Sequence, residues 1–252
     1  MKVSKESVRL LVRAPSQYSH RLASTPEEVQ YAQALRFQVF NLELNEGLAR
    51  SYDTGLDADP FDAVCDHLIV EHVPTRQIVG TYRLQTGMNA KQRLGYYCEQ
   101  EFRFDVFEGA RSRIVELGRA CVHRQHRNLF VLGLLWKGIA DYARTHGARY
   151  LIGCSSLTSQ DPAAGASAYT ELCRNHLAEP AWRTNPLPST ECPLHEVMEE
   201  PVSIPKLLRA YLTIGAKICG PPALDQQFKT IDFLTVLDLE ALPKSTRERF
   251  LG

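Results

Sequence analysis

Two charged side chains lie three residues apart in an apolar segment of this 252-residue chain. Glu116 and Arg119 belong to "RIVELGRACV" (residues 113–122), which otherwise has the pattern of a buried strand. A regular strand puts them on opposite faces, whereas a β-bulge near Gly118 would bring Arg119 to the face of Glu116. Burying charges costs desolvation, so the pattern favours either a structural ion pair or a functional site. Arg83, which ends the strand-like "IVGTYR", is a third charge in similar surroundings.

A basic turn follows this segment and precedes an apolar helix. The turn, "HRQHRNLF" (residues 123–130), carries Arg124 and Arg127 where free backbone N–H groups and the helix dipole favour an anion. A phosphate suits this chemistry. The spacing matches neither a Walker motif nor GxGxxG, so it predicts no nucleotide site. On its own the turn is better explained by solvated basic residues.

The bulk composition excludes several classes of protein. Lysine plus arginine and aspartate plus glutamate both number 29, so the chain does not have the basic character of a typical nucleic-acid binder. A hydrophobic content of 44% and a charged content of 23% are typical of globular proteins. The start of the chain lacks the apolar core of a signal peptide, and no apolar run approaches the ~20 residues of a membrane span. We therefore expect a cytoplasmic protein that does not bind nucleic acid.

Cysteine and histidine form no recognisable metal or nucleophile motif. The seven cysteines have no repeated CxxC spacing, and an odd number without a secretory signal indicates reduced thiols. Cys65 and His67 lie two residues apart, as do Cys121 and His123, but neither pair completes a zinc set of four ligands. No serine or cysteine lies in a GxSxG-type elbow. We expect no bound metal.

The neutral total conceals local imbalance. Residues 1–21 carry five basic residues against one acidic residue, and residues 41–66 carry seven acidic residues against Arg50 alone. Solvated surface is the default explanation for such clusters. The alternative is that one region meets an anion and the other a cation.

These charges must be positioned by a sheet flanked by helices. Helical periodicity and capping signals, such as Thr25 before Pro26, predict the helices, and apolar runs bounded by turn residues predict the strands. The expected helices span residues 25–44, 91–102, 129–147, 162–176 and 205–218. The expected strands span residues 66–73, 77–87, 113–122, 148–157 and 229–239. Residues 45–66 and 180–205 are expected to be loops, and the order indicates an α+β or α/β protein.

Several motifs together resemble one family. They are "LRFQVF" (35–40), "DAVCDHLIV" (62–70), "IVGTYRL" (78–84), "ELGRACVH" (116–123), "LLWKGIADY" (134–142), "YLIGCSS" (150–156) and "GAKICGPPALDQQFKTIDFLTVLDL" (215–239). This combination resembles the GNAT acyltransferase superfamily. More narrowly, it is similar to the bacterial N-acyltransferases that make ornithine lipids and other N-acyl amino acids, which are relatives of the acyl-homoserine-lactone synthases.

The resemblance implies a fold and a domain organisation. The implied fold is α+β, an α/β sandwich with a mixed, mainly antiparallel central sheet flanked by helices. Residues 1–24 are then a basic N-terminal extension, and residues 25–252 are the acyltransferase domain with a C-terminal extension from residue 180. Two departures from the wider family matter. The turn "RQHRNLF" has no glycine, unlike the RxxGxG turn of CoA-dependent members, and the N-terminal tryptophan element of homoserine-lactone synthases is missing.

The resemblance also implies a reaction. A (3-hydroxy)fatty acyl group moves from an acyl carrier protein thioester to the α-amine of an amino acid, with L-ornithine expected, to give a lyso-ornithine lipid. An α-amine has a pKa of about 8, so a base must remove a proton before attack. Glu116 matches the glutamate of the family's E-x-x-R strand and is the implied base, and Arg119 would fix it or bind the substrate carboxylate. Backbone N–H groups of the strand would stabilise the oxyanion.

Further residues are implied to bind the two substrates. Those expected to bind the amino acid are Arg36, Arg83, Glu43, Asp62, Asp66, Asp225 and Asp232. Those expected to bind the phosphopantetheine of the donor are Arg124, Arg127, Asn128 and Leu129. Arg124, Arg127, Lys206 and Arg209 are expected to form a docking surface for the acidic carrier protein. No cofactor is expected to be permanently bound, because acyl-phosphopantetheine is a substrate.

Alternatives remain open at this point. The acceptor is glycine, tyrosine or another amine in one alternative, and the donor is acyl-CoA in a second. In a third, the chain is a catalytically inactive module that binds lipid or carrier protein. The basic N-terminus is expected to make peripheral contact with an anionic inner membrane.

Overall fold

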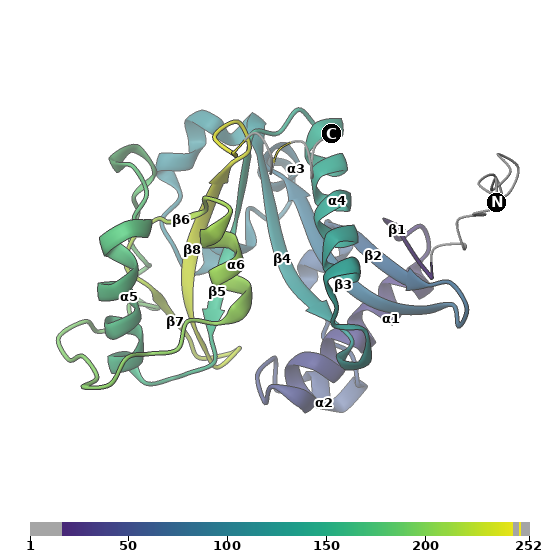
Figure 1. Ribbon diagram of the computed structural model, residues 1–252, viewed down its shortest axis with the longest axis horizontal. Helices are drawn as coiled ribbons and strands as arrows, with labels where there is room; N and C mark the ends of the chain where they lie inside the picture. Colours follow the sequence, from purple (N-terminus) through teal and green to yellow (C-terminus); the bar gives the residue numbers. More distant parts are fainter. Residues whose placement is uncertain (1–16, 244–246, 248–252) are drawn as a thin grey trace, which may run out of the picture.

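Helices cover both faces of one mixed sheet in the computed structural model, which describes residues 17–243 and 247 (Figure 1). The strands are β1 (Tyr18–Leu22), β2 (Asp66–His72), β3 (Gln77–Thr86), β4 (Ile114–Val122), β5 (Tyr150–Leu157), β6 (Lys217–Ile218), β7 (Ala223–Asp225) and β8 (Thr230–Asp238). Their order is β1-β2-β3-β4-β5-β8-β6, with β7 also paired to β8. Only β4 and β5 are parallel neighbours. The predicted mixed, mainly antiparallel sheet is therefore confirmed.

The helical segments are of three kinds. The α-helices are α1 (Pro26–Phe37), α2 (Ser51–Thr54), α3 (Gly87–Gln92), α4 (Leu129–Thr145), α5 (Pro162–His176) and α6 (Lys206–Thr213), and η1 (Gln38–Glu43) is a π-helix. The 3-10 helices are η2 (Pro60–Ala63), η3 (Tyr97–Gln100), η4 (Asp105–Arg113), η5 (Arg124–His126) and η6 (Pro180–Trp182). In Figure 1, α4 lies in front of β2 and β3, and α1 lies behind them.

Alternation along β2 explains why both faces are covered. Leu68 and Val70 are buried in the core that includes Leu135 of α4, whereas Ile69 between them is buried with Leu35 of α1. Successive side chains point to opposite faces of a sheet, so a strand that is apolar at every position needs a partner on each side. The two helices supply those partners and hold β2–β4 rigidly between them.

The structure also departs from the predicted elements. Residues 18–22, which the prediction assigned to the N-terminal extension, form the edge strand β1; residues 1–16 of that extension lie outside the described residues. The helix expected over 205–218 ends at Thr213, because the chain then turns into β6. The helix expected over 91–102 is replaced by α3 and η3, and the acidic stretch 45–66 contains α2 and η2.

The sheet separates between β4 and β5. These strands pair only where Ile114, Val115 and Glu116 meet Tyr150, Leu151 and Ile152. Both strands continue beyond these residues, and in Figure 1 they diverge toward their carboxyl ends. Gly153 marks the point of separation, since a Cβ placed there would lie 2.4 Å from the carbonyl oxygen of Leu117. Only glycine allows this close approach without displacement of backbone.

We expect the substitution Gly153→Ala to lower the free energy of unfolding by about 1–3 kcal/mol, because the added methyl group overpacks against the Leu117 carbonyl. The matched control is Gly133→Ala in α4, where a Cβ would meet nothing within 4 Å. In a helix this change stabilises by about 0.5–1 kcal/mol. Urea denaturation of both variants measures the difference, and equal effects would contradict a tight contact at Gly153.

Candidate active site

A cavity of about 350 Å³ lies where β4 and β5 separate. Residues 117–120 of β4 and 153–156 of β5 supply opposite walls. Within the described part of the chain, the β4 edge that faces β5 has no strand partner beyond Glu116. In a continuous sheet these N–H and C=O groups would be paired to the next strand. Here the backbone groups of β4 are available to a molecule in the cavity.

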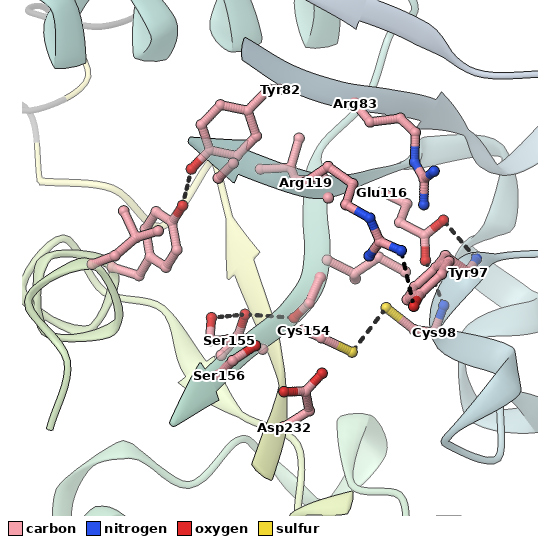
Figure 2. A pocket seen from close by; sticks show the side chains of 18 of the residues that line it. Tyr82, Arg83, Tyr97, Cys98, Glu116, Arg119, Cys154, Ser155, Ser156 and Asp232 are labelled. Carbon is pink, nitrogen blue, oxygen red and sulfur yellow. Dashed lines mark hydrogen bonds between the residues drawn. The ribbon is translucent and has the colours of Figure 1, made fainter. Parts of the chain in front are cut away.

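One end of the cavity is apolar. Leu84, Trp136, Leu208 and Leu237 contribute to its lining. Tyr211 of α6 also lines it and hydrogen-bonds through its hydroxyl to the hydroxyl of Tyr82 on β3 (Figure 2). This bond ties α6 across the cavity, so the apolar end is closed by a helix. The lining suits a hydrocarbon chain.

A β-bulge sets the direction of Arg119. Gly118 pairs with Arg83 and Cys121 pairs with Thr81, so two residues of β4 oppose one residue of β3. Arg119 lies in the bulge with φ of 52°, which is uncommon for a residue other than glycine. The bulge turns its side chain to the face of Glu116 and Arg83. Of the two alternatives that the sequence left open, the regular strand and the bulge near Gly118, the structure has the bulge.

Glu116 is buried at the edge of the cavity and is held by backbone donors (Figure 2). Its Oε2 accepts from the Tyr97 N–H at 2.8 Å, and its Oε1 accepts from the Cys98 N–H at 2.9 Å. The Gln85 amide also donates to Oε2, at 3.3 Å. Burial raises the pKa of Glu116, although the two backbone N–H groups act against this rise. Glu116 therefore anchors η3 and at the same time presents a carboxylate to the cavity.

Three arginines and three aspartates form a buried ion-pair network beside Glu116: Arg36, Arg83, Arg119, Asp57, Asp59 and Asp62. Arg36 lies 2.8 Å from Asp57 and 2.7 Å from Asp62. Asp59 lies 2.6 Å from Arg83 and 2.9 Å from Arg119. Arg119 also donates to the Tyr97 hydroxyl at 3.3 Å. The opposite charges are equal in number, which offsets the desolvation of each.

The network changes the interpretation of the acidic stretch. Burial would raise the pKa of Asp62, but Arg36 and Arg83 overcome this effect and hold it well below its usual range. Arg119 pairs with Asp57 and Asp59 and not with Glu116, so the alternative that it fixes Glu116 is not what the structure shows. Asp57, Asp59 and Asp62 of this stretch bind the protein's own guanidinium groups.

Arg83 keeps one unused donor. Its Nη1 reaches Asp59 and Asp62, whereas its Nη2 is buried without a hydrogen-bond partner among the described residues. Arg83 lines the cavity and lies against the Tyr97 ring, 5.1 Å from its centre. An unpaired buried donor is costly, so this nitrogen is suited to an anionic group that enters the cavity.

Another part of the cavity is acidic. Asp232 of β8, Asp225 of β7 and Glu46 line it, and Glu101 lies behind Cys154, with the carboxyl 3.7 Å from the Cys154 Sγ. Burial and the neighbouring Asp232 raise the pKa of Glu101 well above its usual range. Burial also raises the pKa of Asp232, to about 6. No described lysine or arginine forms an ion pair with any of these four carboxyl groups, in contrast to the network around Arg83.

The basic turn lies at the end of β4 and outside the cavity lining. Asn128 caps α4 by accepting from the Phe130 and Val131 N–H groups at 3.0 Å. Arg127 pairs with Glu43, and its Nε donates to the Val122 carbonyl at 3.0 Å. Arg124 is exposed and has no ion pair among the described residues, so its guanidinium is free for an external anion.

The structure brings only part of the predicted site together. The cavity is lined by Glu116, Arg119, Arg83, Asp225 and Asp232. Outside its lining lie Arg36, Glu43, Asp62, Asp66, Arg124, Arg127, Asn128 and Leu129. Asp66, for example, accepts from the Tyr142 hydroxyl of α4 at 2.7 Å. Sequence reasoning gave no role to Glu101 or Cys154: Glu101 belongs to none of the motifs, and Cys154 lies in "YLIGCSS" without a spacing that indicates chemistry.

The chain is similar to several known proteins in sequence. Residues 35–137 match the family described as an acetyltransferase (GNAT) domain. The chain is 34% identical over 242 residues to an L-ornithine N(alpha)-acyltransferase of Brucella abortus, covering 88% of this chain and 84% of that protein. It is 30% identical over 249 residues to the L-ornithine N(alpha)-acyltransferase of Rhodobacter capsulatus, covering 94% and 96%.

The fold is similar to that of a solved structure as well. FeeM, an N-acyl amino acid synthase from uncultured soil microbes, has a TM-score of 0.55 with 11% identity, over 89% of this chain and 91% of that chain. At this identity the similarity concerns the fold. The similarity to this solved structure therefore also supports the GNAT-like sheet that the sequence predicts.

Proposed function

Because this chain belongs to the family of the L-ornithine N(alpha)-acyltransferases, within the GNAT acyltransferases, it is an acyltransferase, and we propose that it acylates the α-amine of L-ornithine. The observation that carries the proposal is the cavity between β4 and β5. It combines a buried carboxylate, an unsatisfied guanidinium nitrogen, free strand backbone and an apolar end. These are the groups that an amino acid and an acyl thioester need when they react.

The amino acid binds through its carboxylate. Arg83 offers its unpartnered Nη2 to this group, and the neighbouring Arg119 adds positive potential. Both guanidinium groups are held in place by Asp59, so the carboxylate meets a preorganised site. Binding in this way directs the adjacent α-amine toward β4 and Glu116.

Glu116 acts as the base, directly or through a water molecule. An ammonium group cannot attack the thioester, because its lone pair is occupied. A carboxylate with a raised pKa accepts the proton near neutral pH more readily than an exposed glutamate does. The neutral amine then attacks the thioester carbonyl, and the free backbone N–H groups of β4 stabilise the oxyanion that forms. Collapse of this intermediate expels the phosphopantetheine thiolate, which takes up a proton, and leaves an amide.

The donor is a (3-hydroxy)acyl group on acyl carrier protein, and the product is a lyso-ornithine lipid. The acyl chain lies in the apolar end of the cavity, under α6. The phosphate of the phosphopantetheine meets the turn at the start of α4, where Arg124 is free. Among the described residues, no helix is both long and apolar enough to span a bilayer. Contact with the membrane would therefore be peripheral.

We expect Arg124→Ala to raise KM for the acyl carrier protein donor about 3- to 10-fold, with kcat little changed, because one exposed charge contributes to docking but not to chemistry. The effect should diminish at high salt, which screens exposed charges. The control is Arg93→Ala, an exposed arginine directly after α3, which lies at the other end of β4 in Figure 1. Steady-state kinetics at two salt concentrations test this, and an equal effect of both variants would count against the turn.

A thiol-release assay tests the proposed function. The protein is mixed with 3-hydroxyacyl carrier protein, or with the same acyl group on CoA, and with ornithine, lysine, glycine or tyrosine. Release that requires the carrier protein and ornithine supports the proposal. Thiol release with glycine or tyrosine but not with ornithine would overturn ornithine as the acceptor. Thiol release from acyl-CoA but not from the acyl carrier protein would overturn the carrier protein as the donor.

A further inference from the structure

Two carboxyl groups come together at the acidic part of the cavity. Asp232 on β8 and Glu101 after η3 are each 4% exposed. A carboxylate oxygen of each and the Sγ of Cys154 lie within 4.8 Å of one another. Figure 2 shows Asp232 and Cys154 beside the cavity, across from Arg119 and Glu116. Three segments that are distant in the sequence therefore place this acidic pair in the same cavity as Glu116.

The pair lacks a positive partner in the described structure. Asp232 lines the cavity, and its Oδ1 is buried without a hydrogen-bond partner among the described residues. Arg119 acts to lower the pKa of Glu101, but it is already paired with Asp57 and Asp59. In the network around Arg83, by contrast, each aspartate has a guanidinium partner. A buried carboxylate without a positive partner is costly, so the fold retains here a group that is suited to an external cation.

We infer that Asp232 and Glu101 form the subsite for the side-chain ammonium group of a basic amino acid. The inference deepens the proposed function and rests on it. A primary ammonium has three N–H donors and no acceptor, which matches the carboxylate oxygens that Asp232 and Glu101 offer. The α-carboxylate at Arg83 and the side-chain ammonium at Asp232 then hold the two ends of the substrate, with the α-amine between them near Glu116.

A metal ion is the competing occupant, since two carboxylates and a thiol are possible ligands. The Cys154 Sγ lies 3.4 Å from the Cys98 Sγ, and this contact, burial and the nearby acidic groups raise the pKa of Cys154 well above its usual range. A metal would have to displace the thiol proton to use all three groups, whereas an ammonium group needs only the carboxylates. The metal content of the purified protein decides between the two occupants.

The subsite has a consequence for pH. Asp232 and Glu101 share a proton while the cavity holds no cation, because burial and mutual repulsion oppose two adjacent charges. The other charged groups that face them are Asp225 and Glu46, which add to the repulsion, and Arg119, which reduces it; the Cys154 thiol beside them is neutral. Binding of the ammonium releases the shared proton. The affinity for ornithine should then fall as the pH drops through the raised pKa values of the pair, by up to tenfold per pH unit for each proton that must be released.

The experiment compares L-ornithine with L-norvaline, which has the same carbon chain without the side-chain ammonium. The variants are Asp232→Asn and Glu101→Gln, and the control is Asp238→Asn, on the same strand but paired with Arg149 at the surface. Acyl transfer gives kcat/KM for both amino acids. Calorimetry measures binding of each amino acid without turnover, at pH 5.5 and 7.5.

We expect the unmodified protein to favour ornithine over norvaline by roughly 10²- to 10⁴-fold in kcat/KM. Asp232→Asn and Glu101→Gln should remove most of this preference by lowering the value for ornithine, while the value for norvaline stays the same or rises. Asp238→Asn should preserve the preference. Asp232→Asn should not lower Tm, because it removes an uncompensated buried charge, so loss of folding is distinguishable from loss of the subsite.

Several outcomes would overturn the inference. One is an equal fall for both amino acids in Asp232→Asn, and another is no preference for ornithine in the unmodified protein. Stoichiometric metal in the purified protein, lost in Asp232→Asn, would assign the pair to a metal. Acyl transfer to norvaline and ornithine alike would leave acyl transfer intact and remove only the subsite. Binding of ornithine without any acyl transfer would retain the subsite and remove the proposed function.

Discussion

Replacing Glu116 with glutamine is expected to lower kcat for acyl transfer roughly 10²- to 10⁴-fold, the usual contribution of a general base. Glutamine has nearly the same shape but cannot accept the proton of the substrate ammonium. Its Oε1 can still accept from one of the two backbone N–H groups, Tyr97 or Cys98, whereas its NH₂ group faces the other. A modest loss of stability, about 1–3 kcal/mol, therefore accompanies the loss of activity.

The pH profile separates a base from a residue that only anchors η3. Activity of the unmodified enzyme should fall as the pH drops through the raised pKa of Glu116, since the protonated carboxyl cannot accept a proton. In Glu116→Gln the rate should instead follow deprotonation of the substrate's own α-amine. The difference in rate between the two proteins should then narrow at high pH, where the amine is neutral without a base. If the ratio of the two rates is the same at every pH, Glu116 is a positioning residue and not the base. Glu99→Gln, in the same turn but paired with Arg111, is the matched control.

The second large effect concerns stability. Asp59→Ala should lower the free energy of unfolding by about 3–5 kcal/mol, because Arg83 and Arg119 remain buried after losing their shorter ion pairs. For a chain of this size the expected fall in Tm is roughly 6–20 °C. Asp53→Ala in the neighbouring α2 is the control: Asp53 is exposed, and its removal should change stability by no more than about 0.5 kcal/mol.

The same pair of proteins gives a test in acid. Burial would raise the pKa of Asp59, but Arg83 and Arg119 hold it below the usual value. The unfolded state therefore takes up this proton first, at a pKa of about 3.9, and the stabilisation from Asp59 is complete above that pH and is lost below it. The difference in stability between the unmodified protein and Asp59→Ala should shrink from pH 5 to pH 3. A difference that is independent of pH would mean that Asp59 acts through packing and not through its charge.

The sequence was sufficient for the elements that depend on local pattern. The strand with Glu116, the helix from Leu129 and the strand ending at Asp238 each have a mainly apolar pattern between clear boundaries. A bulge near Gly118 was one of two alternatives that the sequence left open, and the pairing of β3 with β4 decides for it. In contrast, β6 and β7 have two and three residues, too few to show a period.

The partners of the charges were not predictable. Asp57, Asp59 and Asp62 reach the arginines because η2 folds back against β3 and β4, a long-range contact with no local signal. From the sequence, those aspartates were as suitable for a substrate cation as Asp232. Glu101 became a candidate only when the sheet placed it beside Cys154 and Asp232. Charge composition thus indicated the chemistry of the site, and the fold decided which charges are already neutralised.

The separation of β4 from β5 also bears on how the chain avoids self-association. An open strand edge exposes unpaired N–H and C=O groups, and at the surface of a protein such an edge recruits strands from other chains. Here the open edge of β4 faces inward, with β5 opposite and α6 closing one end of the cavity. A small molecule can reach these groups, whereas another polypeptide strand cannot align with them. The enzyme therefore keeps unpaired backbone N–H and C=O groups available to its substrate, with little risk of aggregation through that edge.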